Sequence, residues 1–188
     1  MNRDPEKEEK DRFLETLLKE HPGISPRLLA GVIRLPRAPF FRTSSQESLF
    51  GGNRPTGWGK RVSPSLKETI LILDEAEIRP GEKVAIWQPT DLYFLLLLLE
   101  LTTRVVIVEE EPEIRKVIHQ SVDELGHAYI PVLSSLAELE NISGTLSRLI
   151  RVVEPSALPE EGRVKGVLKT IFRSWALKTI PSGGRIEH

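Results

Sequence analysis

The chain has 188 residues, no cysteine and a formal net charge of −1. A chain of this length can bury one full core with a short additional segment, and its nearly balanced charge is not that of a dedicated nucleic-acid binder. Without cysteine it has no disulfide, thiol nucleophile or cysteine-based zinc site. The histidines are scattered along the chain, so we expect no metal site: His21, His119, His127 and His188.

The N-terminus, MNRDPEKEEKDRF, is too charged to be a secretory signal. The longest apolar run, Leu92 to Leu99, is far shorter than the ~20 residues that span a bilayer. We therefore expect a cytoplasmic protein that binds neither a membrane nor a nucleic acid.

Two short helices are predicted near the N-terminus. The first covers residues 11–20 and stops at a Pro-Gly pair; the second has Ser25 as its N-cap and Pro26 at its first position, and Pro36 ends it. Residues 35–65 are rich in Pro, Gly, Ser and Arg and have no sustained period. A loop of this length inside a compact protein tends to be functional.

From residue 66 onward, helical and strand patterns alternate. The predicted helices span 66–76, 91–101, 112–125, 135–140 and 164–177. The predicted strands span 83–87, 104–108, 128–133 and 148–153. This alternation predicts an α/β fold with a mostly parallel sheet and helices on both faces.

Two details of these helices can be predicted as well. Thr90 is the expected cap of the helix that reaches Leu101, with Asp91 in its first turn. The helix that begins at Pro112 and ends at Gly126 is expected to bury one face, made by Ile114, Val117, Ile118 and Val122.

Residues 80–109 have the pattern of the opening strand, turn, helix and second strand of a nucleotide-binding domain. In such domains the first turn is rich in glycine, because a bare backbone lets the cofactor approach the free N–H groups of the helix start. Here the turn runs from Trp87 to Asp91 and contains no glycine. The scaffold is predicted more firmly than its ligand site.

Four segments in order resemble the protein-L-isoaspartate O-methyltransferase family, whose members use S-adenosylmethionine and have a Rossmann-like sheet. The order and spacing of these segments carry the resemblance. The first segment is 23–40 with its Pro36-Arg37 pair, and the second is 55–64, where PTGWGKRVSP is similar to the family's PIGxGQTISQP. The third is 80–93, which includes Tyr93 and is similar to the family's PGxKVLEIGTGSGY. The fourth is 105–109, followed by 146–159 and the Gly183-Gly184-Arg185 turn. The resemblance implies N-terminal helices and a substrate-type loop in residues 1–65, and a methyltransferase domain in residues 66–188.

The chain departs from the family at the cofactor turn. The family sequence Glu-Ile-Gly-Thr-Gly-Ser-Gly is replaced by Ile86 to Leu92, so each glycine position has gained a side chain. Such side chains restrict φ and fill the space through which the cofactor approaches. Asp91 adds a negative charge at the helix start, which would repel the cofactor's carboxylate. The chain also stops where a fifth strand would begin, so we expect the C-terminal strands of the fold to be lacking.

The candidate cofactor-cleft residues are Glu109, Trp87, Gln88 and Asp91. Glu109 ends the second strand about 20 residues beyond Trp87, where an acid accepts hydrogen bonds from ribose hydroxyls. The alternative is that Glu109 and the acids after it only favour the next helix start. Trp87 and Tyr93 could stack on the purine of a different ligand, although an aromatic at the end of a buried strand is more often part of the core.

Two residues of the loop are further candidates. Ser63 keeps the family's serine, and the resemblance implies that it orients a substrate carboxylate if the protein is active; it could equally be an ordinary turn serine. Trp58 lies between two glycines, and an exposed binding contact and a structural role are equally good interpretations.

The sequence favours a methyltransferase-like pseudoenzyme that has lost the ability to bind S-adenosylmethionine. Such a protein would bind a protein or peptide, or would associate with itself. The alternative is an active S-adenosylmethionine-dependent protein carboxyl (isoaspartyl) O-methyltransferase. Because the missing strands would leave an unpaired sheet edge, we also expect a homo-oligomer, such as a dimer, formed across that edge.

Overall fold

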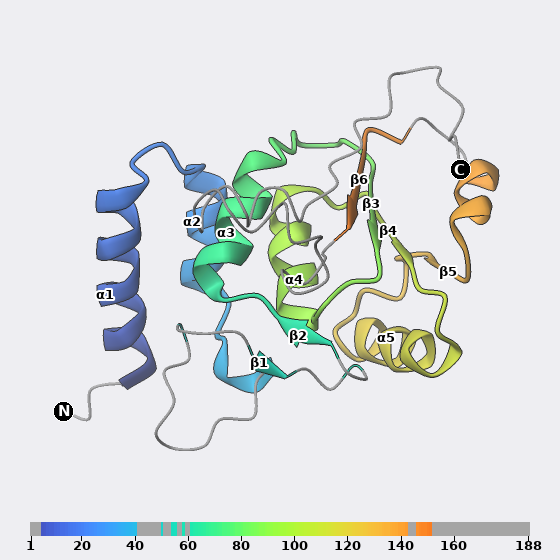
Figure 1. Cartoon of the computed structure of the whole chain (residues 1–188), viewed down its shortest axis with the longest axis horizontal. Helices are drawn as coiled ribbons and strands as arrows, with labels where there is room; N and C mark the ends of the chain where they lie inside the picture. The colour runs from blue at the N-terminus through green and yellow to red at the C-terminus, as the bar shows by residue number, and fades with distance from the viewer. Residues whose placement is uncertain are drawn as a thin grey trace, which may run out of the picture.

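The computed structural model describes residues 5–40, 50, 54–55, 58, 61–142 and 146–151 (Figure 1). The predicted helix 164–177, the Gly183-Gly184-Arg185 turn and much of the 35–65 loop lie outside the described residues. So do the last two positions of the predicted strand 148–153.

The centre of the fold is a parallel sheet of four strands in the order β5-β4-β3-β6. The strands are β3 (Val84–Trp87), β4 (Val105–Val108), β5 (Val132–Leu133) and β6 (Arg148–Arg151). Val84 lies opposite Val105 on one side and Arg148 on the other. The predicted α/β fold with a parallel sheet is confirmed, although β5 is shorter than the predicted strand 128–133.

Alternate residues of the central strands belong to two separate apolar clusters. Val84 and Ile86 of β3 pack with the buried residues of the long helices, whereas Ala85 and Trp87 pack with η2, a 3-10 helix over Leu136–Asn141. This is the period of two that a strand covered on both faces requires. The predicted helical stretch 135–140 is therefore present, but as a 3-10 helix.

Three helices of the α/β unit surround the larger cluster. They are α3 (Leu66–Glu75), α4 (Leu92–Leu101) and α5 (Pro112–Glu124). Seven of the ten residues of α4 are buried, because this helix lies between the sheet and the N-terminal helices (Figure 1). Such a helix is apolar on all sides, which explains its run of leucines.

The buried face of α5 is narrower than predicted. Ile114, Ile118 and Val122 are buried, but Val117 is 42% exposed, so its assignment to this face is wrong. The three buried residues follow a strict spacing of four, and Val117 lies one residue away from that stripe. Gly126 has a φ of 76° and ends the helix, as predicted.

Two helices precede the α/β unit, α1 (Pro5–Glu20) and α2 (Pro26–Arg34). The bounds of α2 agree with prediction, but α1 begins six residues before the predicted start, with proline at its first position. Its first turns contact the end of α2, because Glu6 accepts the Arg37 N–H and Lys10 donates to the carbonyls of Ile33 and Leu35. Buried residues of both helices belong to the same cluster as the sheet. The boundary at residue 65 stays a prediction.

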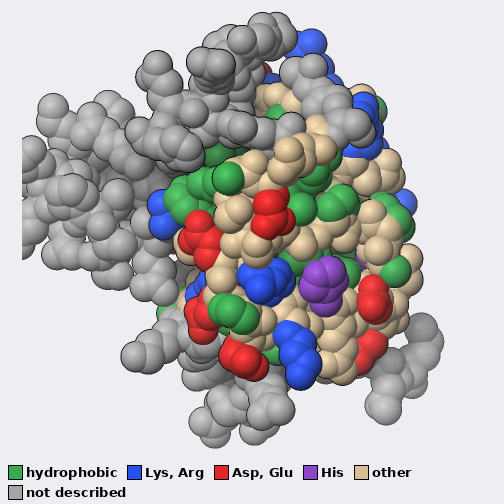
Figure 2. Space-filling view, turned by 90° about the vertical axis from the view of Figure 1, so that its right-hand side faces the viewer, with side chains coloured by type: hydrophobic (Ala, Val, Ile, Leu, Met, Phe, Trp, Pro, Cys, Tyr) green, Lys and Arg blue, Asp and Glu red, His purple; other side chains and the backbone are tan. Residues whose placement is uncertain are grey.

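The face of the described region seen in Figure 2 is mixed in charge. In Figure 2, acidic and basic side chains alternate with hydrophobic ones and a histidine on the face nearest α5. No helix among the described residues is both long and apolar enough to cross a membrane.

Candidate functional site

The candidate site lies at the carboxyl ends of β3 and β4, where doubly wound folds bind their ligands. The turn after β3, the acid after β4 and residues 61–63 of the long loop meet there. The loop residues include β2 (Val62–Ser63), which pairs antiparallel with β1 (Arg54–Pro55).

Glu109 and Arg61 form an ion pair at the centre of this edge. Glu109 has no exposed surface, and its Oε2 and Oε1 accept hydrogen bonds from Arg61 Nη1 at 2.5 Å and Nη2 at 2.9 Å. Arg61 Nη1 also donates to the Pro89 carbonyl at 3.0 Å, and the Glu111 N–H donates to Glu109 Oε1 at 3.0 Å. The predicted ribose acceptor is therefore occupied on both oxygens by a side chain of the same molecule.

Asp91 connects the loop to the start of α4. Its Oδ1 accepts the Phe94 N–H at 2.7 Å, while its Oδ2 accepts the hydroxyls of Ser63 at 2.6 Å and Thr90 at 3.0 Å. Asp91 is thus the N-cap, and the prediction that Thr90 caps this helix is wrong. Aspartate is the stronger cap here because its two oxygens serve the helix N–H and the loop hydroxyl at once.

Gln88 stands at the first glycine position of the family turn and keeps a glycine-like backbone, with a φ of 53°. Its Nε2 donates to Glu110 Oε2 at 3.2 Å, and its Oε1 accepts from Arg151 Nη2 at 3.3 Å. The left-handed conformation is uncommon for a residue with a Cβ. Gln88 thus combines a backbone conformation that glycine adopts more easily with a side chain that bridges the ends of β4 and β6.

The aromatic candidates of the turn have partners in the protein itself. The Arg151 guanidinium lies 3.9 Å from the centre of the Trp87 ring. Tyr93 is buried under α2 and the following segment, with the Arg37 guanidinium 5.1 Å from its ring centre. Burial raises the pKa of the Tyr93 hydroxyl far above its usual range, so it stays protonated.

The loop residues are buried as well. Trp58 is only 6% exposed and belongs to the main cluster, so its interpretation as an exposed binding contact is wrong. Ser63 is buried, and its hydroxyl is directed to Asp91. The flanking glycines of Trp58 indicated a loop correctly, but an indole on a loop can still be buried in the core.

The structure brings the predicted residues Ser63, Asp91, Gln88 and Glu109 to one edge, and adds Arg61, which sequence reasoning missed. Arg61 stands where the related segment PIGxGQTISQP has threonine. That exchange of a small neutral residue for an arginine was the available signal. Its partner is 48 positions away, which no local pattern reveals.

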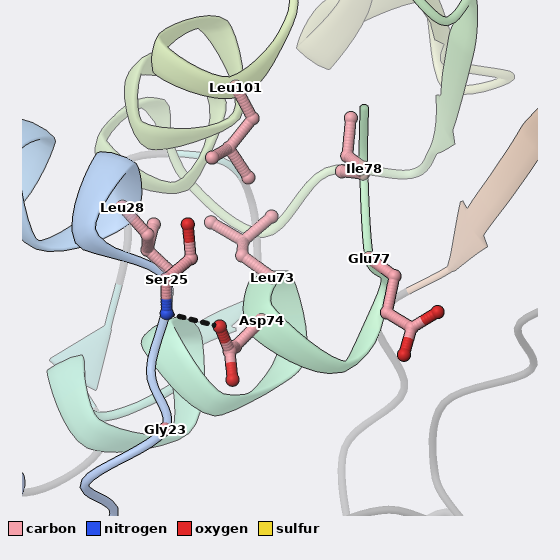
Figure 3. A pocket seen from close by; sticks show the side chains of 8 residues that line it. All are labelled: Gly23, Ser25, Leu28, Leu73, Asp74, Glu77, Ile78 and Leu101. Atoms are coloured by element: carbon pink, nitrogen blue, oxygen red, sulfur yellow. Dashed lines mark hydrogen bonds between the residues drawn. The ribbon is translucent and has the colours of Figure 1, made fainter. Parts of the chain in front are cut away.

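A separate pocket of 280 Å³ lies at the opposite ends of the strands (Figure 3). It is lined by the start of α2, the end of α3 and the end of α4. Asp74 accepts the Ser25 N–H at 2.8 Å, and the Glu77 side chain points away from the other residues that line the pocket. Among the described residues no group of His, Asp or Glu side chains is placed to hold a metal ion.

Comparison with known proteins finds a likeness of fold. A solved structure of a protein-L-isoaspartate O-methyltransferase matches with a TM-score of 0.57 and 16% sequence identity. The match covers 88% of this chain and 51% of that one, so this chain spans about half the length of the matched protein. No family model and no curated protein matches by sequence. The chain thus has a methyltransferase-like fold.

Proposed function

We propose that this chain is a methyltransferase-shaped protein that has lost the binding of S-adenosylmethionine and works as a binding or self-associating module. The fold is that of a methyltransferase, but the edge that would hold a nucleotide is filled by side chains of the chain.

The Arg61–Glu109 ion pair is the observation that carries this proposal. A carboxylate that binds ribose must offer its oxygens to the hydroxyls of the ligand. Both oxygens of Glu109 instead accept charge-assisted bonds from one guanidinium, in the bidentate geometry that is the strongest for this pair. A ligand would have to displace Arg61 and compensate for a fully buried carboxylate.

The turn supports the same conclusion. Thr90 and Asp91 are buried in the positions of the family's second glycine and its serine, and their side chains bond to each other. The Asp91 carboxylate accepts the N–H of Phe94, the third residue of α4, which is one of the free helix-start N–H groups that an anionic ligand would otherwise use. Charge and space at this helix start both oppose the cofactor's carboxylate.

Thermal unfolding with added S-adenosylmethionine or S-adenosylhomocysteine tests the proposal. A ligand at 100 times its dissociation constant stabilises a protein by about 2.7 kcal/mol. We expect no stabilisation of the wild-type protein by either compound at millimolar concentration. Saturable stabilisation by both would favour the alternative, an active protein carboxyl O-methyltransferase in which Ser63 orients the substrate.

Self-association is the second part of the proposal. Within the residues that the structure describes, β6 pairs only with β3, and a strand with one free side can pair with another chain. We expect light scattering at high micromolar concentration to give the mass of a dimer or larger. The mass of a monomer throughout this range would refute self-association.

A further inference from the structure

We propose that the carboxyl edge is a guanidinium site that recognises an arginine side chain, filled within the chain by Arg61 and able to accept an arginine of a partner peptide. This inference rests on the proposed function, because it names the chemical class that the binding module would take.

The acceptors at this edge match a guanidinium in number and direction. Glu109 Oε1, Glu109 Oε2 and the Pro89 carbonyl all accept from the two terminal nitrogens of Arg61, at 2.9, 2.5 and 3.0 Å. The planar fork of arginine can serve three acceptors of this kind, whereas the ammonium of lysine is a compact point charge. The site therefore selects arginine over lysine.

Residues other than Arg61 also hold Glu109 in place. The Glu111 N–H donates to Glu109 Oε1, and Arg115 Nη1 donates to the Glu109 carbonyl at 2.9 Å. Pro89 lies in the turn between β3 and the Asp91 cap of α4. A site whose acceptors are fixed by the core loses little entropy when a ligand binds.

Arg61 is better placed for exchange than its partner. Its side chain is 19% exposed, whereas that of Glu109 is 0% exposed. Its backbone lies just before β2, a strand of two residues outside the main sheet. An arginine from another molecule can thus replace the Arg61 side chain without breaking a strand of the core.

The test compares N-acetylarginine amide with N-acetyllysine amide on the Arg61→Ala variant, using thermal unfolding. We expect the arginine compound to raise the Tm of Arg61→Ala with a dissociation constant at least about tenfold lower than that of the lysine compound. On the wild-type protein the response should be at least about tenfold weaker, because the tethered Arg61 competes at a high effective concentration.

The double variant Arg61→Ala/Glu109→Gln is the matched control. It keeps the shape of the site but removes the charge, so the preference for arginine should disappear. If Arg61→Ala does not fold, the two compounds are compared on the wild-type protein, where the arginine compound should still raise the Tm at a lower concentration than the lysine compound. Equal responses to the two compounds, or no response, would overturn the guanidinium site.

The two proposals fail separately. Titration of the wild-type protein with S-adenosylhomocysteine addresses the proposed loss of the cofactor. The preference of the Arg61→Ala variant for arginine over lysine tests only the guanidinium site. The outcome of one experiment does not determine the outcome of the other.

Discussion

Glu109 is completely buried, and an ionised carboxylate in that position needs a partner. Arg61 supplies the charge, and the Glu111 N–H supplies a further hydrogen bond. Truncating one member of a buried pair leaves the other charge without compensation, which costs far more than the pair contributes in total. The ion pair therefore couples the long loop to the end of β4.

We predict that Arg61→Met destabilises the protein by about 3–5 kcal/mol at neutral pH, because Glu109 is left buried and unpaired. Chemical denaturation measures the change. Arg34→Met is the control: it breaks an ion pair with Glu100 in which the Arg34 side chain is 66% exposed, and it should cost less than about 1 kcal/mol. Similar losses in the two variants would show that Arg61 does not compensate a buried charge.

The left-handed backbone of Gln88 gives a second prediction at this scale. Gln88→Gly should be more stable than Gln88→Ala by about 1 kcal/mol, because both lose the side-chain bridge and only alanine has a Cβ at positive φ. At the exposed helical residue Lys116 the order of stability should be reversed, with Lys116→Ala more stable than Lys116→Gly. If alanine is the better residue at both positions, the turn is not strained.

At the scale of elements, the packing of α2 on α4 depends on one glycine. A Cβ built on Gly31 would lie 2.8 Å from Glu100 Cγ, 3.1 Å from Glu100 Cβ and 3.5 Å from Leu97 Cδ2. The two helices approach this closely because position 31 has no side chain. The N-terminal helices are thereby held against the α/β unit.

Gly31→Ala should therefore destabilise the protein by about 1–3 kcal/mol, although alanine is the better helix former. Gly23→Ala is the control, because a Cβ there meets no atom within 4 Å. Equilibrium unfolding of both variants measures the difference. A neutral or stabilising Gly31→Ala would mean that the helices can separate at no cost.

The elements could be predicted where periodicity alone determines them. The apolar spacing predicts the strand that ends at Trp87 and the positions of the helices α2 and α5. Gly126 follows the end of α5, as its position in the sequence indicates. The cap of α4 was assigned to Thr90 because two adjacent residues can both cap, and only the loop hydroxyl of Ser63 favours Asp91. A choice of this kind depends on tertiary contacts.

The site could be predicted only in part. Glu109 and the filled turn follow from the register of the turn between β3 and α4, which keeps the length of a cofactor motif. The pairing of Arg61 with Glu109 could not be inferred, because an ion pair across 48 positions leaves no local pattern. The sequence leaves the role of Trp58 open for a related reason, because flanking glycines indicate backbone freedom and say nothing about burial, and the structure decides for the core.

For the molecule as a whole, the chain combines a methyltransferase-like fold with a carboxyl edge that its own side chains occupy. The fold likeness holds at 16% identity, so the two proteins share a fold although few of their aligned residues are identical. A scaffold tolerates such change because its core needs apolar residues of the right size and period. A ligand site does not tolerate such sequence change, because binding depends on particular chemical groups at particular positions.

Isothermal titration of the wild-type protein with S-adenosylhomocysteine tests the central claim most directly. We expect no saturable heat up to millimolar ligand, because Arg61 occupies both oxygens of Glu109 and the Asp91 carboxylate already accepts the Phe94 N–H at the start of α4. Saturable one-to-one binding that Glu109→Gln abolishes would contradict the claim, since it would place the nucleotide on the carboxylate that Arg61 holds.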